Sequence, residues 1–221
     1  MCSSDLLFSS LSVGRYHSCG LKSDGSAYCW GYNSPGQLGD GTTTSKSAPV
    51  AVSGGQLFSS LSLGGYTSCG LKSDGSAYCW GYNDTGQLGD GTTTDSTAPV
   101  AVSGGHLFSS LSLGFYHSCG LKSDGSAYCW GDNDYGHLGD GTTTDSPAPV
   151  AVSGGHLFSS LSVGNYHSCG LKSDGSAYCW GYNSPGQLGD GTTTDSPAPV
   201  AVSGGHLLDR KSTRLNSSHQ I

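Results

Sequence analysis

Short apolar runs separated by glycine-rich turns recur along this chain with a period of 50 residues. The segment LKSDGSAYCWG is repeated without change, starting at Leu21, Leu71, Leu121 and Leu171. In the first copy the pattern predicts strands over residues 11–14, 18–22, 26–30 and 49–52, with Phe8 leading into the first. Four short strands per copy, each bounded by turn residues, are typical of one blade of a β-propeller.

The sequence therefore predicts an all-β fold, a β-propeller of four blades with about four antiparallel strands each. We place the blades at about residues 7–56, 57–106, 107–156 and 157–208, which together form one repeat array.

The three-residue turn at positions 23–25 sets the register of the middle hairpin. Gly25, third in the turn, suits a type I turn followed by a bulge, because glycine accepts a positive φ there. Cys19 then faces Cys29 at a non-hydrogen-bonded pair, where Cα atoms approach to about 4.5 Å. This register predicts four cross-strand pairs, Cys19–Cys29, Cys69–Cys79, Cys119–Cys129 and Cys169–Cys179. Tyr28 and Trp30 are expected on the opposite side of the hairpin, over Gly20.

Repeated cysteine pairs favour disulfides in an exported protein. Pairs of small buried thiols in a cytosolic propeller are the alternative that the sequence leaves open.

The amino-acid composition argues against several classes of protein. The chain has 221 residues, of which 37 are glycine and 11% are charged, and it contains no glutamate, which disfavours helices. Its formal charge of −7 disfavours a nucleic-acid partner, because phosphate recognition needs a basic face. No apolar run is long enough for a membrane span. The nine cysteines are an odd number, which requires an explanation.

Both ends fall outside the repeat and resemble translated sequencing adapter. Residues 209–219 read DRKSTRLNSSH, which back-translates to a common library adapter, and residues 1–6 fit the reverse complement of the same adapter. We expect residues 1–6 and 209–221 to be adapter-derived and exclude them from the fold. The odd Cys2 is then removed, and eight cysteines remain, two per repeat. On this interpretation the native N-terminus is missing, so the localisation is uncertain, with an extracellular or cell-surface location favoured by the cysteine pairs.

A longer motif runs through every copy, GxxHSxxLxxDGxxYxWGxNxxGQLG, from Gly14 to Gly39 in the first. It resembles the regulator of chromosome condensation repeat, with Thr67 in place of the histidine and His137 in place of the glutamine. In its paired cysteines the chain resembles the bacterial branch of this family, which includes alpha-tubulin-suppressor-like and β-lactamase-inhibitor-protein-like propellers. The resemblance implies a seven-bladed ring, so four copies are expected to be a fragment of a longer array. A kelch propeller is the structural alternative, but the Trp-Gly-x-Asn run fits it poorly.

The repeat does not contain a recognisable catalytic or metal-binding motif. The glycine-rich stretch 36–41 lacks the Gly-Lys-Ser/Thr of a phosphate-binding loop. Adjacent His17 and Ser18 are no evidence of a catalytic triad, and Asp24 and Asp40 precede glycines in turns, where aspartate is a common turn former. His17 and the cysteine pair would offer a zinc ion only three ligands, and no fourth ligand is apparent. We therefore expect no enzyme activity, no cofactor, no metal and no small-molecule ligand.

The copies differ from one another mainly in their loops, at the positions of residues 15, 32, 34–35 and 45–47 of the first copy and their equivalents. Loops on a rigid β scaffold often carry binding residues, although neutral drift would give the same pattern. The candidate binding residues are Arg15, Tyr32, Tyr82, Phe115, Asp132, Asp134, Tyr135, Asn165 and Tyr182. Tyr16 and its equivalents belong either to this face or to the packing between blades, and packing is favoured.

These observations favour a non-enzymatic protein-interaction scaffold whose variable loops bind a protein partner on one propeller face. A carbohydrate-binding propeller is the first alternative, and the family resemblance adds a second, a guanine-nucleotide exchange factor for a small GTPase. Tryptophans buried between blades would favour the scaffold, whereas tryptophans exposed at each blade junction would favour sugar binding.

Overall fold

A computed structural model describes residues 6–203, which form four separate four-stranded antiparallel sheets. The expected adapter-derived segments lie outside the described residues, apart from Leu6. The strands are β1 (Ser10–Val13), β2 (His17–Leu21), β3 (Ala27–Gly31) and β4 (Lys46–Ala51); β5 (Ser60–Leu63), β6 (Thr67–Leu71), β7 (Ala77–Gly81) and β8 (Ser96–Ala101); β9 (Ser110–Leu113), β10 (His117–Leu121), β11 (Ala127–Gly131) and β12 (Ser146–Ala151); β13 (Ser160–Val163), β14 (His167–Leu171), β15 (Ala177–Gly181) and β16 (Ser196–Ala201). Two short 3₁₀ turns, η1 (Ser53–Gly55) and η2 (Ser103–Gly105), follow β4 and β8.

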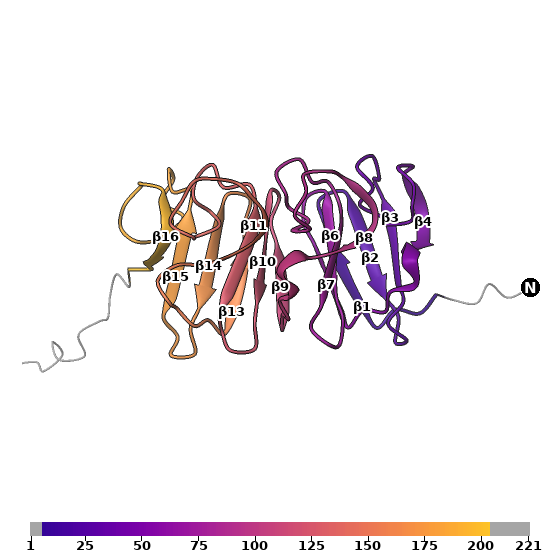
Figure 1. Cartoon of the computed structure of the whole chain (residues 1–221), viewed down its shortest axis with the longest axis horizontal. Helices are drawn as coiled ribbons and strands as arrows, with labels where there is room; N and C mark the ends of the chain where they lie inside the picture. Colours follow the sequence, from indigo (N-terminus) through magenta and orange to yellow (C-terminus); the bar gives the residue numbers. More distant parts are fainter. Residues whose placement is uncertain (1–5, 204–221) are drawn as a thin grey trace, which may run out of the picture.

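Each sheet is a simple meander in which consecutive strands are neighbours (Figure 1). The first strands β1, β5, β9 and β13 lie next to one another from sheet to sheet, while β4, β8, β12 and β16 form the outer edges. This arrangement is the blade stacking of a β-propeller, which confirms the predicted fold class.

The middle hairpin has the register expected from its turn. The amide of Lys22 donates to the carbonyl of Ser26 at 2.9 Å, and Gly25 has φ +87°. Cys19 pairs directly with Cys29, the Cα atoms are 4.1 Å apart, and the two sulfurs are bonded. The other three hairpins carry the same bond, so all four predicted cysteine pairs are confirmed.

Two local expectations need correction. The outer strand β4 begins at Lys46 rather than at Pro49, because an edge strand does not need the amide that proline lacks. The space over Gly20 is filled by Phe8, not by Tyr28 and Trp30 themselves: a Cβ at Gly20 would lie 2.5 Å from the Phe8 ring, which stacks on Trp30 at 5.8 Å.

The core lies between blades, where the cysteine side of one sheet packs against the aromatic side of the next. Trp80 is fully buried, and its Nε1 donates to the backbone carbonyl of Gln37 in the preceding blade at 3.0 Å. Gly39, with φ +70°, lies against the indole, and a Cβ there would be 2.7 Å from Nε1. Trp130 and Trp180 repeat this bond.

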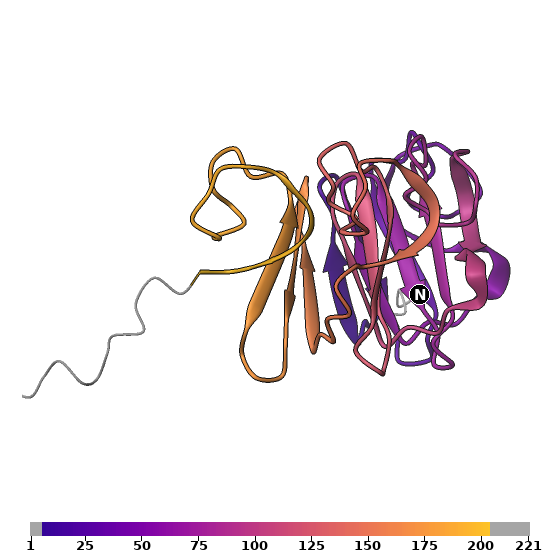
Figure 2. The same cartoon turned by 60° about the vertical axis from the view of Figure 1, so that its left-hand side comes forward.

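Among the described blades, the last has a neighbour on one side only (Figure 2), and no described blade precedes the first. Leu171 in the fourth blade is 44% exposed, whereas its equivalent Leu21 in the first is 4% exposed. Trp30, which has no blade before it in the described residues, is only partly buried. The packing of each sheet thus depends on a neighbour on both sides.

A buried asparagine organises the long loop after the third strand of each blade. Asn33 is fully buried; its Oδ1 accepts from the amide of Leu38 at 2.8 Å, and its Nδ2 donates to the carbonyls of Thr42 and Thr44 at 2.9 and 3.2 Å. Asn83, Asn133 and Asn183 make the same bonds. This network explains why LGDGTTT is unchanged between copies and gives the neighbouring variable residues a fixed base.

Candidate functional site

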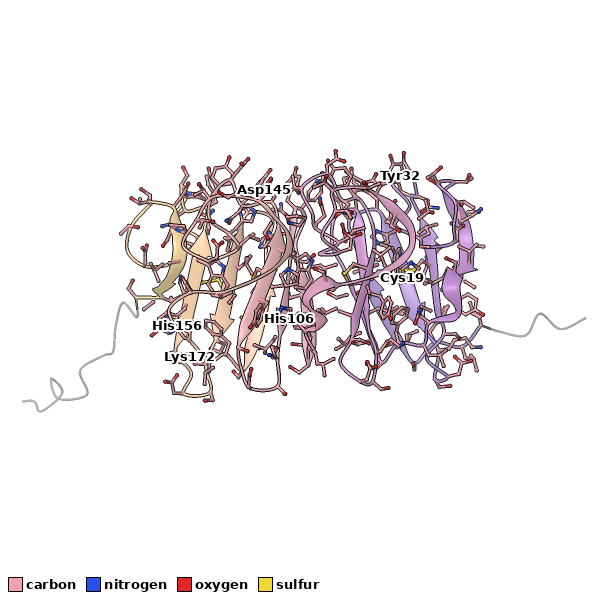
Figure 3. All side chains as sticks on the ribbon, viewed as in Figure 1. Cys19, Tyr32, His106, Asp145, His156 and Lys172 are labelled. Carbon is pink, nitrogen blue, oxygen red and sulfur yellow. A yellow bond between two sulfur atoms is a disulfide. The ribbon has the colours of Figure 1, made fainter. Side chains whose placement is uncertain are left out.

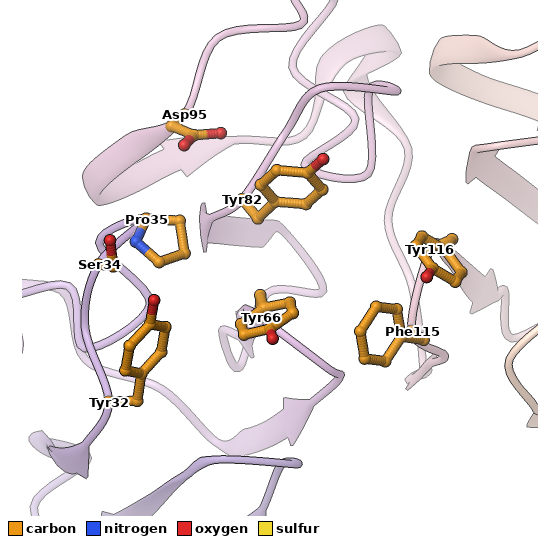
Figure 4. A pocket seen from close by; sticks show the side chains of 8 residues that line it. All are labelled: Tyr32, Ser34, Pro35, Tyr66, Tyr82, Asp95, Phe115 and Tyr116. Atoms are coloured by element: carbon orange, nitrogen blue, oxygen red, sulfur yellow. The ribbon is translucent and has the colours of Figure 1, made fainter.

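Most of the variable positions lie at one end of the strands. Tyr32 and Tyr82 directly follow β3 and β7, Phe115 precedes β10, and Asp95 precedes β8. They line a groove of about 540 Å³ that extends over the first three blades (Figure 4). Its wall is formed by Tyr32, Ser34, Pro35, Tyr66, Tyr82, Asp95, Phe115 and Tyr116.

Aromatic rings continue beyond the groove across all four blades. We call this set the aromatic belt; its members are Tyr16, Tyr32, Tyr66, Tyr82, Phe115, Tyr116, Tyr135, Tyr166 and Tyr182. Successive ring centroids are close: Tyr66 is 5.3 Å from Phe115, and Tyr116 is 5.1 Å from Tyr166. Such contacts stabilise the rings relative to one another while leaving edges and hydroxyls in solvent. Tyr32 and Tyr135 are 44% and 37% exposed.

Tyr16 and its equivalents belong both to the blade junctions and to the aromatic belt. The sequence favours packing between blades for these tyrosines, and Tyr16 does stack on Tyr66 of the next blade, with ring centroids 5.4 Å apart. However, Tyr16 is 46% exposed, and Tyr66 and Tyr116 line the groove. These tyrosines therefore connect the blades and form part of the variable face.

Carboxylates accompany the rings. Asp84 accepts a hydrogen bond from the hydroxyl of Tyr82 at 2.9 Å, and Asp95 accepts from the amide of Asn83 at 2.7 Å. Burial raises the pKa of Asp95. Burial, together with the bond to Asp84, raises the pKa of Tyr82 to about 12. Arg15 is a basic residue on this face, with its Cζ 5.0 Å from the ring centres of both Tyr16 and Phe115.

The third blade contains a pair of matched departures from the repeat. Asp132 stands where the other copies have tyrosine, and His137 stands where they have glutamine. The two side chains contact each other, with Nε2 of His137 2.9 Å from Oδ1 of Asp132, but the contact does not have the geometry of a hydrogen bond. His137 is fully buried. The amide of Asp134 also donates to Asp132, at 3.3 Å. Asp132 is therefore tied to its own blade, which the sequence analysis missed because it treated the two departures separately.

The other candidates divide between two places. Arg15, Phe115 and Asn165 line a second hollow of about 440 Å³ between the ends of the innermost strands. Tyr135 and Tyr182 contact each other in the belt, with centroids 4.8 Å apart. The candidate residues omitted Tyr66, Asp95 and Tyr116; Asp95 is equivalent to Ser45, in a segment that already differed between copies.

The opposite face carries one lysine from each blade. The amine of Lys22 is 3.4 Å from Asp24 and lies 5.9 Å from the ring centre of Tyr28. Lys72, Lys122 and Lys172 lie over the equivalent tyrosines. Figure 3 shows Lys172 toward one side of the molecule and Tyr32 and Asp145 toward the other.

Histidine–serine contacts exist, but they are buried in the junctions between blades. Nε2 of His17 is 2.8 Å from Oγ of Ser68, and that hydroxyl donates to the carbonyl of Gln37 at 2.8 Å. The serine proton is thus already engaged, so the imidazole donates and Nδ1 is left bare and buried. Burial lowers the pKa of His17 to about 4. This geometry is that of a structural contact and not of an activated nucleophile.

Two other kinds of site are absent from residues 6–203. Within them, no three His, Cys or Asp side chains are grouped so that they could hold a metal ion. The same residues include no helix with the length and hydropathy needed to cross a membrane.

Known structures share this blade arrangement. Human WBSCR16 matches with a TM-score of 0.80 and 26% identity over 92% of this chain and 55% of its own. Yeast RCC1 (Prp20) bound to Kap60 matches with a TM-score of 0.79 and 23% identity over 91% of this chain and 50% of its own. The ectodomain of the Physcomitrella patens receptor kinase CR4 has a TM-score of 0.52 at 29% identity, over 79% of this chain and 39% of its own. This chain therefore spans about half the length of the first two.

Two family models, both described as the regulator of chromosome condensation (RCC1) repeat, match every copy. One covers residues 8–37, 58–87, 108–136 and 158–187, and the other covers 24–71, 74–121, 124–171 and 174–211. Together with the four sheets and the shared blade arrangement, these matches show that the chain belongs to the RCC1 repeat family.

Proposed function

We propose that this chain is a non-enzymatic protein-interaction module that binds a protein partner through the aromatic belt. The observation that carries the proposal is the different placement of the two aromatic residue types. The tryptophans of blades two to four are fully buried in the junctions, while Tyr32 and Tyr135 of the variable loops are exposed on one face and Tyr82 and Tyr182 beside them are half-buried. Tyrosine is enriched at protein interfaces because it supplies a large, amphipathic contact area at a low cost in side-chain entropy.

The scaffold beneath the belt suits this role. Four disulfides, one per blade, constrain the hairpins, and the buried asparagines hold the adjoining loops. Variable side chains on a rigid base lose little conformational freedom on binding, which favours affinity. The disulfides also support a location in an oxidising compartment, and we include export in the proposal.

Carbohydrate binding is the second candidate, because exposed tyrosine rings beside carboxylates can also stack on and hydrogen-bond to sugars. It is weaker, since the tryptophans that would serve best are buried. Nucleotide exchange ranks third. The yeast RCC1 match, at 23% identity, shows the shared fold alone, and the acidic charge and the disulfides favour a different setting.

The test compares two double variants with the unchanged chain. Tyr32→Ala with Tyr135→Ala removes two exposed rings of the belt, whereas Leu57→Ala with Leu107→Ala removes similarly exposed apolar side chains near the lysine face. Each immobilised protein is exposed to extracts of the source organism and, separately, to a glycan array. A retained protein is then identified, purified and titrated against each variant.

We expect a protein ligand that binds the unchanged chain and the leucine variant, and binds the tyrosine variant at least about tenfold more weakly, as for loss of interface aromatic residues. Glycan binding that depends on the tyrosines, without any protein ligand, would replace the proposal by the carbohydrate alternative. A protein ligand that binds both variants equally would contradict the assignment to the belt.

A further inference from the structure

The geometry points to an arginine-bearing, basic segment of a partner protein as the occupant of the groove at the first three blades. This inference rests on the proposed function and specifies the chemistry of the partner. It is carried by the way aromatic rings, carboxylates and the chain's own arginine are placed.

The face already holds one guanidinium. Arg15 places its Cζ 5.0 Å from the ring centres of Tyr16 and Phe115, although Phe115 comes from a blade two repeats away. A cation is attracted to the negative face of such a ring, and arginine adds planar stacking that lysine cannot provide. Phe115 also lines the groove, so the same cluster of rings that receives Arg15 continues along its wall.

The groove itself has negative charge without a matching cation. Asp95 lines it and uses Oδ1 to accept from the amide of Asn83, which leaves Oδ2 free for a ligand. Asp84 lies beside it through its contact with Tyr82. Of the ion pairs formed by residues 6–203, none involves Asp84 or Asp95. The burial that raises the pKa of Asp95 is unfavourable for its charged form, and a bound cation would offset that cost.

Within residues 6–203, the lysines do not supply that cation. Lys22, Lys72 and Lys122 lie beside the opposite hairpin turns, where their amines sit over Tyr28, Tyr78 and Tyr128. Lys46 is at the variable face but is 3.6 Å from Asp40. Among the residues that the structure describes, no side chain pairs with the groove carboxylates, and we assign the matching charge to the ligand.

The shape of the groove also favours an extended chain. Its walls come from three successive blades, with Tyr32 and Pro35 at one end, Asp95 and Tyr82 in the second blade, and Phe115 at the other end (Figure 4). A guanidinium stacked on Tyr82 would be near Asp95, which could accept a charge-assisted hydrogen bond. Rings that flank this position would contact the neighbouring residues of the segment.

The probe is a short fluorescein-labelled peptide of alternating arginine and glycine, titrated into the full chain and followed by fluorescence anisotropy. Matched peptides carry lysine, citrulline or glutamate in place of arginine. Citrulline keeps the planar, hydrogen-bonding head but removes the charge. Each titration is repeated at low and at high salt, because an electrostatic contribution weakens as salt rises.

Two isosteric variants isolate the carboxylate. Asp95→Asn keeps an oxygen that can accept from the amide of Asn83 but removes the charge. Asp195→Asn is the matched control: Asp195 accepts from the amide of Asn183 at 2.6 Å in the same way but does not line the groove. Tyr82→Leu tests the ring with little change in size.

We expect the arginine peptide to bind more tightly than the lysine peptide, and the citrulline and glutamate peptides to bind weakest. Asp95→Asn should raise the Kd of the arginine peptide about tenfold, as for loss of a charge-assisted hydrogen bond, and Tyr82→Leu about fivefold. Asp195→Asn should leave it unchanged.

Equal binding of the arginine and citrulline peptides, or equal effects of Asp95→Asn and Asp195→Asn, would overturn the inference. Tighter binding of the glutamate peptide would do the same. If the arginine peptide fails while a purified protein ligand still depends on Tyr32 and Tyr135, the protein-interaction proposal stands and only the arginine inference is lost.

Discussion

His17 provides a sharp test of the packing between blades, because the chain contains its own replacement. The equivalent residue in the second blade is Thr67, which is buried and donates from Oγ1 to the carbonyl of Tyr82 at 3.1 Å. The fold therefore accepts threonine at this position. His17→Thr should give a folded protein in which one buried imidazole has been removed.

The expected effect is a change in the dependence of stability on pH. Burial lowers the pKa of His17 from 6.5 to about 4, so below pH 6.5 the folded state binds fewer protons than the unfolded state. Its contribution to stability is present at neutral pH and is lost as the pH falls from 6.5 to about 4. At about 1.4 kcal/mol per pH unit, the loss over this range is roughly 3 kcal/mol. His17→Thr should cost about 1 kcal/mol at neutral pH, through the lost bond to Ser68, and should not suffer the acid loss.

Unfolding by urea, followed by tryptophan fluorescence across this pH range, gives the free energy of unfolding for both proteins. Their difference cancels the contributions of the aspartates and of the other histidines, which both proteins share. We expect the difference to change sign between neutral pH and pH 4. Parallel curves would refute the reasoning, as would an NMR titration in which the His17 ring protonates near pH 6.5.

Three further predictions concern stability. Gly39→Ala should destabilise by about 1–3 kcal/mol more than Gly189→Ala, because both glycines have positive φ but only Gly39 touches a following tryptophan, Trp80; equal unfolding midpoints would contradict this. In the third blade, Asp132→Tyr and His137→Gln together restore the pattern of the other copies. The double variant should therefore lose about 1 kcal/mol less free energy of unfolding than the two single variants lose in sum; additive melting shifts would argue against the contact. Replacing both cysteines of the first blade by alanine should lower the free energy of unfolding by about 2–3 kcal/mol, since the disulfide closes a loop between residues 10 positions apart in the sequence. An unchanged melting temperature would show that the bond is not formed in solution.

The parts of the fold that could be predicted from the sequence are those that local chemistry determines. The turn at Gly25 fixes the hairpin register within a few residues, so the pairing of Cys19 with Cys29 follows from counting. Alternation and turn residues likewise place the strands to within a few residues of their observed bounds. The fourth strand was the least accurate, because the rule that proline begins a strand does not hold at a sheet edge.

Contacts between segments far apart in the chain could not be predicted in this way. The ring over Gly20 comes from Phe8, whose path across the sheet depends on how the chain enters the blade. The acceptor for the indole of Trp80 is a carbonyl of another repeat, at Gln37, and its position depends on the stacking of whole sheets. The belt arises for the same reason, since its rings meet only when successive blades lie side by side.

The interlocking of each tryptophan with the carbonyl of the preceding repeat has a consequence for how such arrays change over time. The repeats offer their neighbours closely similar contact surfaces, so repeats can be duplicated, deleted or recombined without a new interface having to arise. Variable loops are carried along in each exchange, and new recognition surfaces can thus be assembled by shuffling. The third repeat limits such exchange, because Asp132 in a variable loop contacts His137 in the junction. Only an exchange that moves both residues together would keep that repeat interchangeable with the others.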